Sequence, residues 1–244
     1  MFPLRDHNPT EIFPLFTIAL GILTTAAWIV VQGAGAYEPL VASICALGVV
    51  PAEITGQALM RGDEICTGAN IGPAALLTSV FLHGGWGHLI GNLWFLWVFG
   101  NNIEDSMGHM RFLGFYLVTG AAAAAVQVAL APASSVPMVG ASGAISGIMG
   151  AYIVLYPKAR IDTLVFFWIV QLPAWGILGY WLALQLSGVL DAQSMGGGVA
   201  YGAHLGGFVA GVVLIPLFRN NKLVAAKRGG VVLARDELDH GGWW

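Results

Sequence analysis

The feature that most constrains this chain is a series of long segments without a single Asp, Glu, Lys or Arg. Five of them, residues 12–31, 88–103, 112–139, 163–190 and 192–218, are long enough to cross about 30 Å of hydrocarbon as helices. A sixth, residues 140–156, is close to the lower limit. Charged residues make up only 9% of the chain and the mean hydropathy is +0.76, which is too apolar to cover a water-facing globule. We therefore predict an all-α, polytopic membrane protein with six transmembrane helices.

The positions of the basic residues test that count independently. If the N-terminus is cytoplasmic, the inside segments are residues 1–11, 104–111, 157–162 and 219–244. These segments hold every one of the 10 Lys and Arg residues except Arg61. This positive-inside bias favours an even number of crossings. We expect a multi-pass protein of a bacterial plasma membrane, with both termini cytoplasmic.

The chain divides into a membrane domain, residues 1–218, and a short solvated tail, residues 219–244. The longest connection, residues 32–87, lies outside between the first two helices. Its apolar pieces, residues 40–50 and 74–82, are too short to span, so we expect them at the interface or partly re-entrant. Cys45 and Cys66 both lie in this connection, where they can either pair or remain separate thiols.

Two other interpretations of the chain are disfavoured. The segment Ala34-Gly35-Ala36 resembles a signal-peptide cleavage site, but the apolar run before it is longer than a signal peptide needs, so we expect the first helix to be retained. The formal net charge of -3 is spread along loops and tails and forms no basic stripe. We therefore predict membrane lipids as partners and no nucleic acid.

Polar residues open the second, fourth and sixth predicted helices, which all run from the outer face inward. His88 opens the second helix, and Asn92 follows one turn later on the same face. Ser142 begins the fourth helix, and His204 lies near the start of the sixth. Because these helices share one direction, we expect the four side chains at one depth.

Small residues recur at close-packing spacing on the fourth and sixth helices. Gly143 and Gly147 lie on one, and Gly207 and Gly211 on the other, four residues apart in each case. Lipid provides no hydrophobic force between helices, so close approach depends on such grooves. Packing alone would explain these glycines, but the same contact would also bring Ser142 within hydrogen-bonding distance of His204.

A serine beside a histidine indicates nucleophilic catalysis. The imidazole can act first as general base and then as general acid. His88, Asn92 and the unpaired amide of Ser142 can stabilise an oxyanion. No Asp or Glu lies in the fourth or sixth helix, so we predict a Ser142–His204 dyad that uses no cofactor.

A metal site built from His83, His88 and His204 is an alternative. No carboxylate lies beside these histidines, and the HExxH pattern of metalloproteases is absent from the sequence. We therefore predict no metal.

The three motifs together resemble the rhomboid family of intramembrane serine proteases. The resemblance runs from His83-Gly84-Gly85-Trp86-Gly87-His88 with Asn92, through Gly140-Ala141-Ser142-Gly143, to Ala203-His204 with Gly206-Gly207. It implies a six-helix rhomboid-like bundle and cleavage of transmembrane protein substrates. It also implies Ser142 as nucleophile, His204 as base, and His88 and Asn92 as oxyanion donors. His83, Gly140 and Gly143 would support them, and Glu104 is similar to a family glutamate that braces the cytoplasmic helix ends.

The chain departs from the family pattern at two places. Pro73-Ala74-Ala75 stands where relatives often carry Trp-Arg, and Ser146 stands where many place an aromatic that stacks on the histidine. His204 must then be held by a hydrogen bond or by another ring. A non-catalytic relative that only binds transmembrane clients is the second functional alternative, although such a protein would not need both Ser142 and His204.

Overall fold

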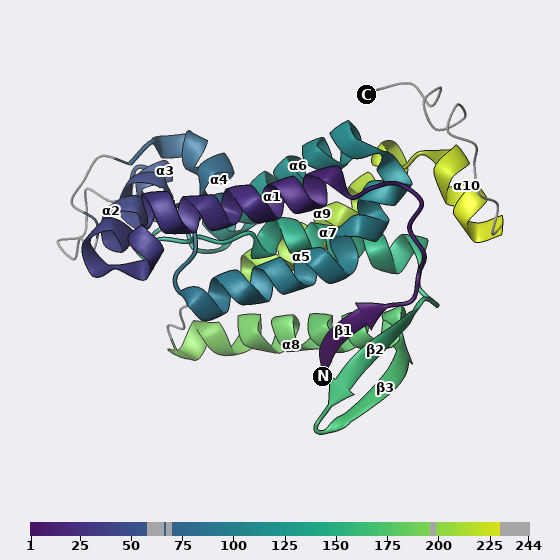
Figure 1. Cartoon of the computed structure of the whole chain (residues 1–244). Coiled ribbons are helices and arrows are strands. Elements are labelled where there is room, and N and C mark those ends of the chain that lie inside the picture. The colour runs from purple at the N-terminus through teal and green to yellow at the C-terminus, as the bar shows by residue number, and fades with distance from the viewer. Residues whose placement is uncertain (58–65, 67–69, 196–198, 230–244) are drawn as a thin grey trace.

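The computed structural model describes residues 1–57, 66, 70–195 and 199–229. It is mostly helical, and its long helices lie side by side in one bundle (Figure 1). These helices are α1 (Leu15–Ala26), α5 (Trp86–Met107), α6 (His109–Leu130), α7 (Ser142–Leu155), α8 (Ala174–Met195) and α9 (Tyr201–Phe218). A π-helical turn, η1 (Ala27–Val31), extends α1.

The outside connection folds into short helices at one end of the bundle (Figure 1). They are η2 (Gly33–Gly35), α2 (Tyr37–Leu47), α3 (Pro51–Ile54), η4 (Gly72–Ala74), α4 (Ala75–Thr78) and η5 (Ser79–Phe81). Cys45 and Cys66 form a disulfide, which decides between the two alternatives left open by the sequence. Val49 and Met138 exchange two backbone hydrogen bonds, of 2.9 and 2.7 Å, that tie this connection to the loop before α7.

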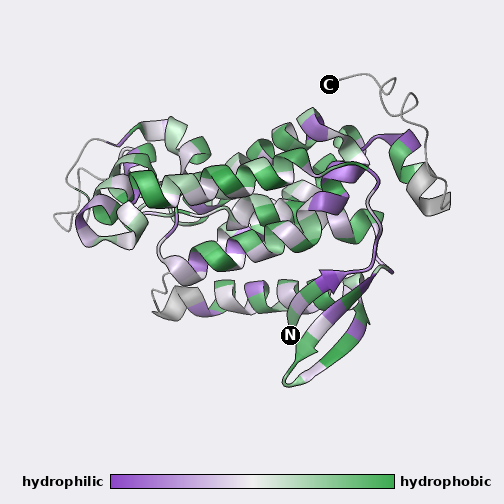
Figure 2. Cartoon of the chain, in the orientation of Figure 1, coloured by the Kyte–Doolittle hydropathy of each residue, from purple (hydrophilic) through white to green (hydrophobic). Residues whose placement is uncertain are grey.

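Helix α7 is the centre of the core. Nearly all its residues are buried, and Ile148 and Tyr152 are fully enclosed. The surrounding helices are coloured mostly as hydrophobic in Figure 2. Many of their large apolar side chains are exposed, as Val213 illustrates with 64% of its surface accessible. Among the described helices, α6 and α9 are each long and apolar enough by themselves to cross a membrane. A bundle that is apolar both inside and outside is typical of a membrane protein.

The prediction that residues 163–190 form one helix is wrong. Helix α8 begins only at Ala174, and a three-stranded antiparallel sheet precedes it, with strand order β1-β2-β3. Its strands are β1 (Phe2–Asp6), β2 (Arg160–Val165) and β3 (Trp168–Pro173). Hydropathy alone cannot separate an apolar hairpin from an apolar helix. The fold is therefore not purely helical.

Other predicted boundaries also shift. Helix α6 ends at Leu130 instead of continuing to residue 139, because Pro132 and Pro137 cannot continue a helix. Part of the expected tail forms α10 (Asn221–Gly229), whose Val224 is buried. Residues 196–198, Arg61 and residues 230–244 lie outside the described residues.

Candidate functional site

Helices α7 and α9 touch through their backbones. A Cβ atom added at Gly207 would overlap the carbonyl oxygen of Gly143, and one added at Gly211 would overlap that of Gly147. Glycine at these positions is what permits the contact. The predicted glycine groove between the two helices is therefore confirmed.

This contact brings together the first turns of α7 and α9. Nε2 of His204 lies 2.8 Å from Oγ of Ser142. Ser142 is the first residue of α7, and both side chains are partly buried. At this distance the Ser142 hydroxyl can donate to an unprotonated Nε2, which is the arrangement that general-base activation of a hydroxyl requires.

The other nitrogen of His204 has a partner that sequence reasoning missed. Nδ1 of His204 lies 2.7 Å from Oε1 of Gln185 on α8, and Gln185 is only 8% exposed. The amide nitrogen of Gln185 donates to the backbone carbonyl of Trp181 at 3.4 Å, which turns its oxygen toward the ring. An amide oxygen can only accept, so Nδ1 carries the proton and Nε2 is free to accept. The sequence signal that could have pointed to Gln185 is that it is a polar side chain in a mostly apolar helix.

The aromatic absent at position 146 is replaced by other contacts. The Trp181 ring lies 6.0 Å from that of His204, and the Tyr201 ring lies 6.5 Å from it, edge-on. Ser146 instead donates its hydroxyl to the backbone carbonyl of Ser142 at 2.6 Å. A hydrogen bond and two rings thus surround the imidazole, so both alternatives offered for holding His204 are realised.

His83, His88 and Asn92 form a second group beside Ser142. The Asn92 amide nitrogen lies 2.8 Å from Nε2 of the fully buried His83, and the His83 and His88 rings pack edge-on at 4.9 Å. Nδ1 of His88 accepts from the Gly84 amide at 3.3 Å, which leaves its Nε2 as the protonated nitrogen. Asn92 keeps a second N–H free for another acceptor.

Gly140 makes room for the His88 ring. It has a φ of +130°, a conformation that disfavours L side chains. A Cβ at this position would lie 2.7 Å from Nε2 of His88 and 3.6 Å from Oγ of Ser142. The N–H of His88 therefore faces the space directly beside the Ser142 hydroxyl.

A second residue missed by the sequence analysis, Gln32, fixes the loop that carries His83. Its side-chain nitrogen donates to the His83 carbonyl at 2.8 Å, and its oxygen accepts from the His83 amide at 2.8 Å. Gln32 is fully buried at the end of the first helix. This pair of bonds joins the first helix to the loop that presents the histidines.

The Ser142 and His204 side chains line a cavity of about 910 Å³. Its walls include His88, Asn92 and Phe95 from α5 and Trp181 from α8. This volume is within the range of cavities that bind organic ligands, so a side chain or a short peptide segment can reach the hydroxyl.

The alternative metal site is not assembled. The ring nitrogens of His204 face Ser142 and Gln185, while Nε2 of His83 faces Asn92. Within residues 1–57, 66, 70–195 and 199–229, no three His, Cys, Asp or Glu side chains gather as a metal would need.

Glu104 connects three helices at the far end of the bundle. Its fully buried carboxylate accepts from the Phe16 amide at 2.8 Å and from the amide and hydroxyl of Thr17 at 2.8 and 2.7 Å. Nδ1 of His109 lies 2.6 Å away. The carboxylate thus joins α5 to the first turns of α1 and α6.

Comparison with known proteins identifies the class of fold. The family model described as "Rhomboid domain" matches residues 73–221, which include Ser142, His204 and the whole cavity wall named above. The chain belongs to the rhomboid family, and its helical bundle is a membrane bundle.

Individual relatives agree with that assignment. The chain is 34% identical over 143 residues to "Rhomboid-like protein 11, chloroplastic" of Arabidopsis thaliana, covering 57% of this chain and 50% of the relative. It is 32% identical over 146 residues to "Rhomboid protein 1, mitochondrial" of Saccharomyces cerevisiae, covering 57% and 40%. It is 28% identical over 165 residues to "Presenilin-associated rhomboid-like protein A, mitochondrial" of Danio rerio, covering 67% and 42%. The chain thus spans half or less of the length of these relatives.

These relatives correct one expectation from the sequence. They are chloroplastic and mitochondrial proteins, which points to organellar membranes. The prediction of a bacterial plasma membrane is therefore contradicted. Charge placement can orient helices in a membrane but cannot identify which membrane it is.

Proposed function

We propose that this chain is an intramembrane serine endopeptidase that cleaves peptide bonds in or near transmembrane segments of other proteins. The observation that carries the proposal is the 2.8 Å separation between Oγ of Ser142 and Nε2 of His204 in a cavity of the bundle. Ser142 is the nucleophile and His204 is the base. The six-span arrangement assigned to this function uses α1 with η1, α5, α6, α7, α8 and α9.

The reaction proceeds in two halves. Ser142 attacks the carbonyl carbon of the substrate while its hydroxyl proton passes to Nε2 of His204, giving a tetrahedral oxyanion. His204 then returns that proton to the leaving amine, the C–N bond breaks, and an ester to Ser142 remains. Water, activated by the same imidazole, hydrolyses the ester and regenerates both groups.

The oxyanion needs donors that are in position before the charge develops. The Nε2–H of His88, held beside Gly140, and the second N–H of Asn92 are assigned this role. The backbone amide of Ser142, at the N-terminus of α7, is the third. His83 fixes the Asn92 amide and packs against the His88 ring, so it is a positioning residue.

Gln185 completes the arrangement on the other side of His204. By accepting from Nδ1–H it selects the tautomer in which Nε2 is a base, and it stays bonded when the ring becomes positively charged. Because an amide is neutral, Gln185 contributes orientation and a dipole but no opposing charge. We propose it as a positioning residue, which makes the catalytic unit a dyad with an amide support.

A transmembrane substrate must expose its peptide bond before attack. Helical carbonyls are bonded within the helix, so the scissile segment has to unwind locally. Small or helix-destabilising residues near the cut reduce that cost. We therefore expect such residues to favour cleavage.

The test is cleavage of a model transmembrane substrate by the purified protein in detergent micelles. The parent chain is expected to cleave it, and Ser142→Ala and His204→Ala are each expected to lose the activity. A metal chelator is expected to leave the rate unchanged. Cleavage by Ser142→Ala at the parent's rate would refute the dyad, and binding without cleavage by the parent would favour a client-binding protein.

A further inference from the structure

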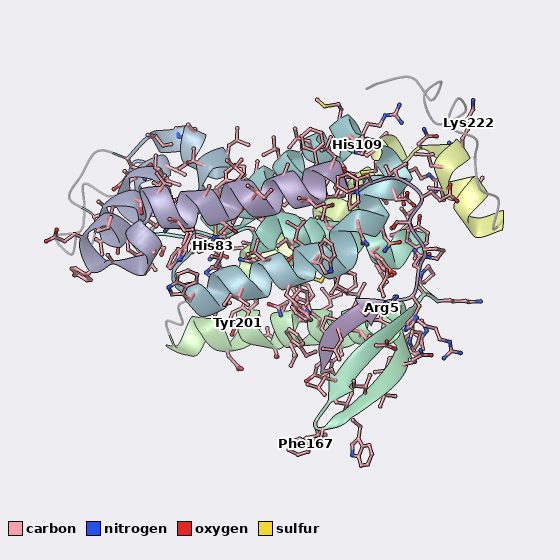
Figure 3. The ribbon with its side chains drawn as sticks, in the orientation of Figure 1. Arg5, His83, His109, Phe167, Tyr201 and Lys222 are labelled. Carbon is pink, nitrogen blue, oxygen red and sulfur yellow. A yellow bond between two sulfur atoms is a disulfide. The ribbon has the colours of Figure 1, made fainter. Side chains whose placement is uncertain are left out.

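The hairpin of β2 and β3 is polar at its base and apolar at its tip. Arg160, Asp162 and Gln171 lie in the half next to the helices. The tip is strongly exposed: Phe166 is 88%, Phe167 94%, Trp168 76% and Ile169 66% exposed. Figure 3 shows Phe167 at the far end of the hairpin, directed away from the ribbon. A contiguous apolar patch of this kind marks an interaction surface.

The turn itself departs from ordinary hairpin chemistry. Val165 pairs with Trp168, so the turn consists of Phe166 and Phe167 alone. Phe166 has a φ of +53°, a conformation that two-residue turns normally give to Gly, Asn or Asp. Two phenylalanines therefore occupy a turn that local backbone preference would fill with small residues. Backbone conformations of this kind cluster at functional sites.

One anchor on α5 fixes the depth of the tip. The indole N–H of Trp94 donates to the carbonyl of Pro3 at 2.7 Å, and the Phe2 ring packs 5.6 Å from the Trp94 ring. Phe2 is paired with Leu164, close to the turn. Trp94 is 13 residues before the end of α5 at Met107, which is about 20 Å at the α-helical rise. The outer half of the hairpin is therefore level with the middle of the bundle.

A second anchor fixes the direction of the sheet. The Asn102 side chain donates to the Asp6 carboxylate at 2.7 Å, and Asp6 is paired with Ile161 at the base. Since Trp94 and Asn102 are eight residues apart on α5, the sheet runs along the helix for about 12 Å. In Figure 1 the hairpin leaves the bundle obliquely and its tip lies below α8, but along the direction of the helices the tip stays between their two ends.

The charges at the base agree with this orientation. Arg160 is the first residue of β2, and Lys158 lies two residues before it. Arg5, labelled in Figure 3, lies on the adjoining strand β1. Basic residues at a membrane surface lie next to anionic headgroups, and aromatic residues lie at the boundary below them. The hairpin has both zones in that order.

We propose that the hairpin tip, Phe166–Ile169, is inserted among the lipids of one membrane leaflet. This is the leaflet at the end of the bundle where Lys158, Arg160 and Arg5 lie, and these three residues contact its headgroups. The partner of this surface is lipid. The inference depends on membership of a membrane family and on the two α5 anchors, and it is independent of the catalytic proposal.

Inserting the exposed edge of the sheet into lipid costs free energy, but only part of the edge is affected. β3 is an edge strand, and unpaired backbone groups are unfavourable in hydrocarbon. The edge is short, its basal residue Gln171 remains in the polar half, and Pro173 has no N–H to leave unpaired. The unpaired backbone groups that do enter the lipid belong to the few residues near the tip. The apolar side chains of these residues also gain the most free energy by leaving water.

The experiment places a spin label at Phe167→Cys in the full chain, reconstituted in vesicles of phosphatidylcholine and phosphatidylglycerol. Among the described residues the only cysteines are already paired with each other, so the new thiol is the one that reacts. Collisions of the label with oxygen, which partitions into lipid, are compared with collisions with a water-soluble nickel chelate. Val213→Cys, 64% exposed on α9, serves as the lipid control. Lys158→Cys, an exposed position that the proposal places among the headgroups, serves as the water-accessible control.

The label at Phe167 is expected to match Val213, with a high ratio of oxygen to nickel collisions, and Lys158 to give a low one. Ile169→Cys is expected to repeat the Phe167 result. A Phe167 ratio as low as that of Lys158 would overturn the proposal, because the tip would then be accessible to water and would not lie among the lipid chains. An immobilised label reached by neither reagent would also overturn it, because the tip would then contact protein.

Discussion

Oε1 of Gln185 lies 2.7 Å from Nδ1 of His204, on the side of the ring opposite Ser142. The imidazole is therefore bonded at both nitrogens, and the residue on its far side is a neutral amide from α8. No charged residue has to be buried to orient the ring. In a membrane bundle this arrangement avoids the cost of desolvating a carboxylate.

We predict that Gln185→Leu lowers kcat by about 10- to 100-fold, the cost of one hydrogen bond to a group that becomes charged during the reaction. KM should remain nearly unchanged, since the amide faces the imidazole. Steady-state kinetics on a model substrate make the measurement.

Two variants separate positioning from simple packing. Gln185→Glu keeps an acceptor at the same place and should restore most of kcat, whereas Ser187→Ala, on the exposed side of the same helix, should behave like the parent. Equal kcat for Gln185→Leu and the parent would show that Gln185 does not position His204.

Gly207→Ala should separate α9 from α7. The added methyl would meet the carbonyl oxygen of Gly143, and overpacking of this kind costs about 1–3 kcal/mol. Because the same contact holds Ser142 beside His204, activity should fall together with the thermal midpoint. Val209→Ala, at a site 57% exposed on the same helix, should change neither. A fully active, equally stable Gly207→Ala would show that the close contact is not needed.

Gly140→Ala should impair catalysis more than folding. Its Cβ would lie 2.7 Å from Nε2 of His88, so the ring would have to move away from the oxyanion position. Loss of one oxyanion donor reduces the rate by about 10²- to 10³-fold, while the strained φ costs about 1–3 kcal/mol of stability. Cleavage rate and thermal unfolding are measured on the same sample. Gly179→Ala, whose added methyl meets nothing within 4 Å, is the control. Wild-type cleavage by Gly140→Ala would contradict the role of His88.

Glu104→Ala should destabilise the bundle at the end far from the site. It leaves the partly buried amide of Phe16 and the buried amide of Thr17 without their acceptor, at a cost of about 3 kcal/mol. Glu104→Gln keeps one acceptor oxygen and should lose less. Thermal unfolding in detergent measures both, and equal midpoints for all three proteins would show that the carboxylate does not hold α1.

Low pH should weaken the contact between His7 and Asp162 at the base of the hairpin. A hydrogen bond from His7, at 2.9 Å, holds the pKa of the Asp162 carboxyl below its ordinary value of 3.8. A carboxyl with a lowered pKa contributes stability above the unfolded-state value, and this is lost as the pH falls through the folded-state value. An NMR titration of Asp162 should give a midpoint below 3.8, and His7→Ala should raise it. A parent midpoint at or above the ordinary value would contradict the contact.

The proximity of Ser142 and His204 could be predicted from the sequence because helix direction and depth follow from hydropathy and charge. Ser142 and His204 begin helices of the same direction, and glycines at four-residue spacing bring those helices together. The helix direction follows from composition and the glycine spacing is periodic, so both can be found in a sequence. The contact of 2.8 Å then follows from packing.

Gln185 could not be assigned in the same way. Its contact with His204 depends on the rotation of α8 about its own axis, and no periodic pattern fixes that rotation for a helix exposed to lipid along one side. Gln32 was hidden for a related reason, since its partner is the backbone of His83, 51 residues later. Side-chain-to-backbone bonds across a long connection leave little trace in a sequence.

The hairpin was missed because its tip is as apolar as a helix. Residues 163–170 read as the start of a transmembrane segment, and the turn at Phe166 and Phe167 lacks the Gly, Asn or Asp that would have indicated it. The pairing of β1 with β2 adds a contact between residues about 160 positions apart, such as Phe2 with Leu164. Local patterns do not report such pairings.

The proposed function requires that the Ser142 hydroxyl is a nucleophile activated by His204. The most direct measurement is labelling of the purified protein with a fluorophosphonate, which forms a covalent bond only with an activated serine, followed by mass spectrometry of the modified peptide. We expect a single modified residue, Ser142, and loss of labelling in His204→Ala, with Ser187 unmodified throughout. Labelling at another serine, or undiminished labelling of Ser142 in His204→Ala, would contradict it.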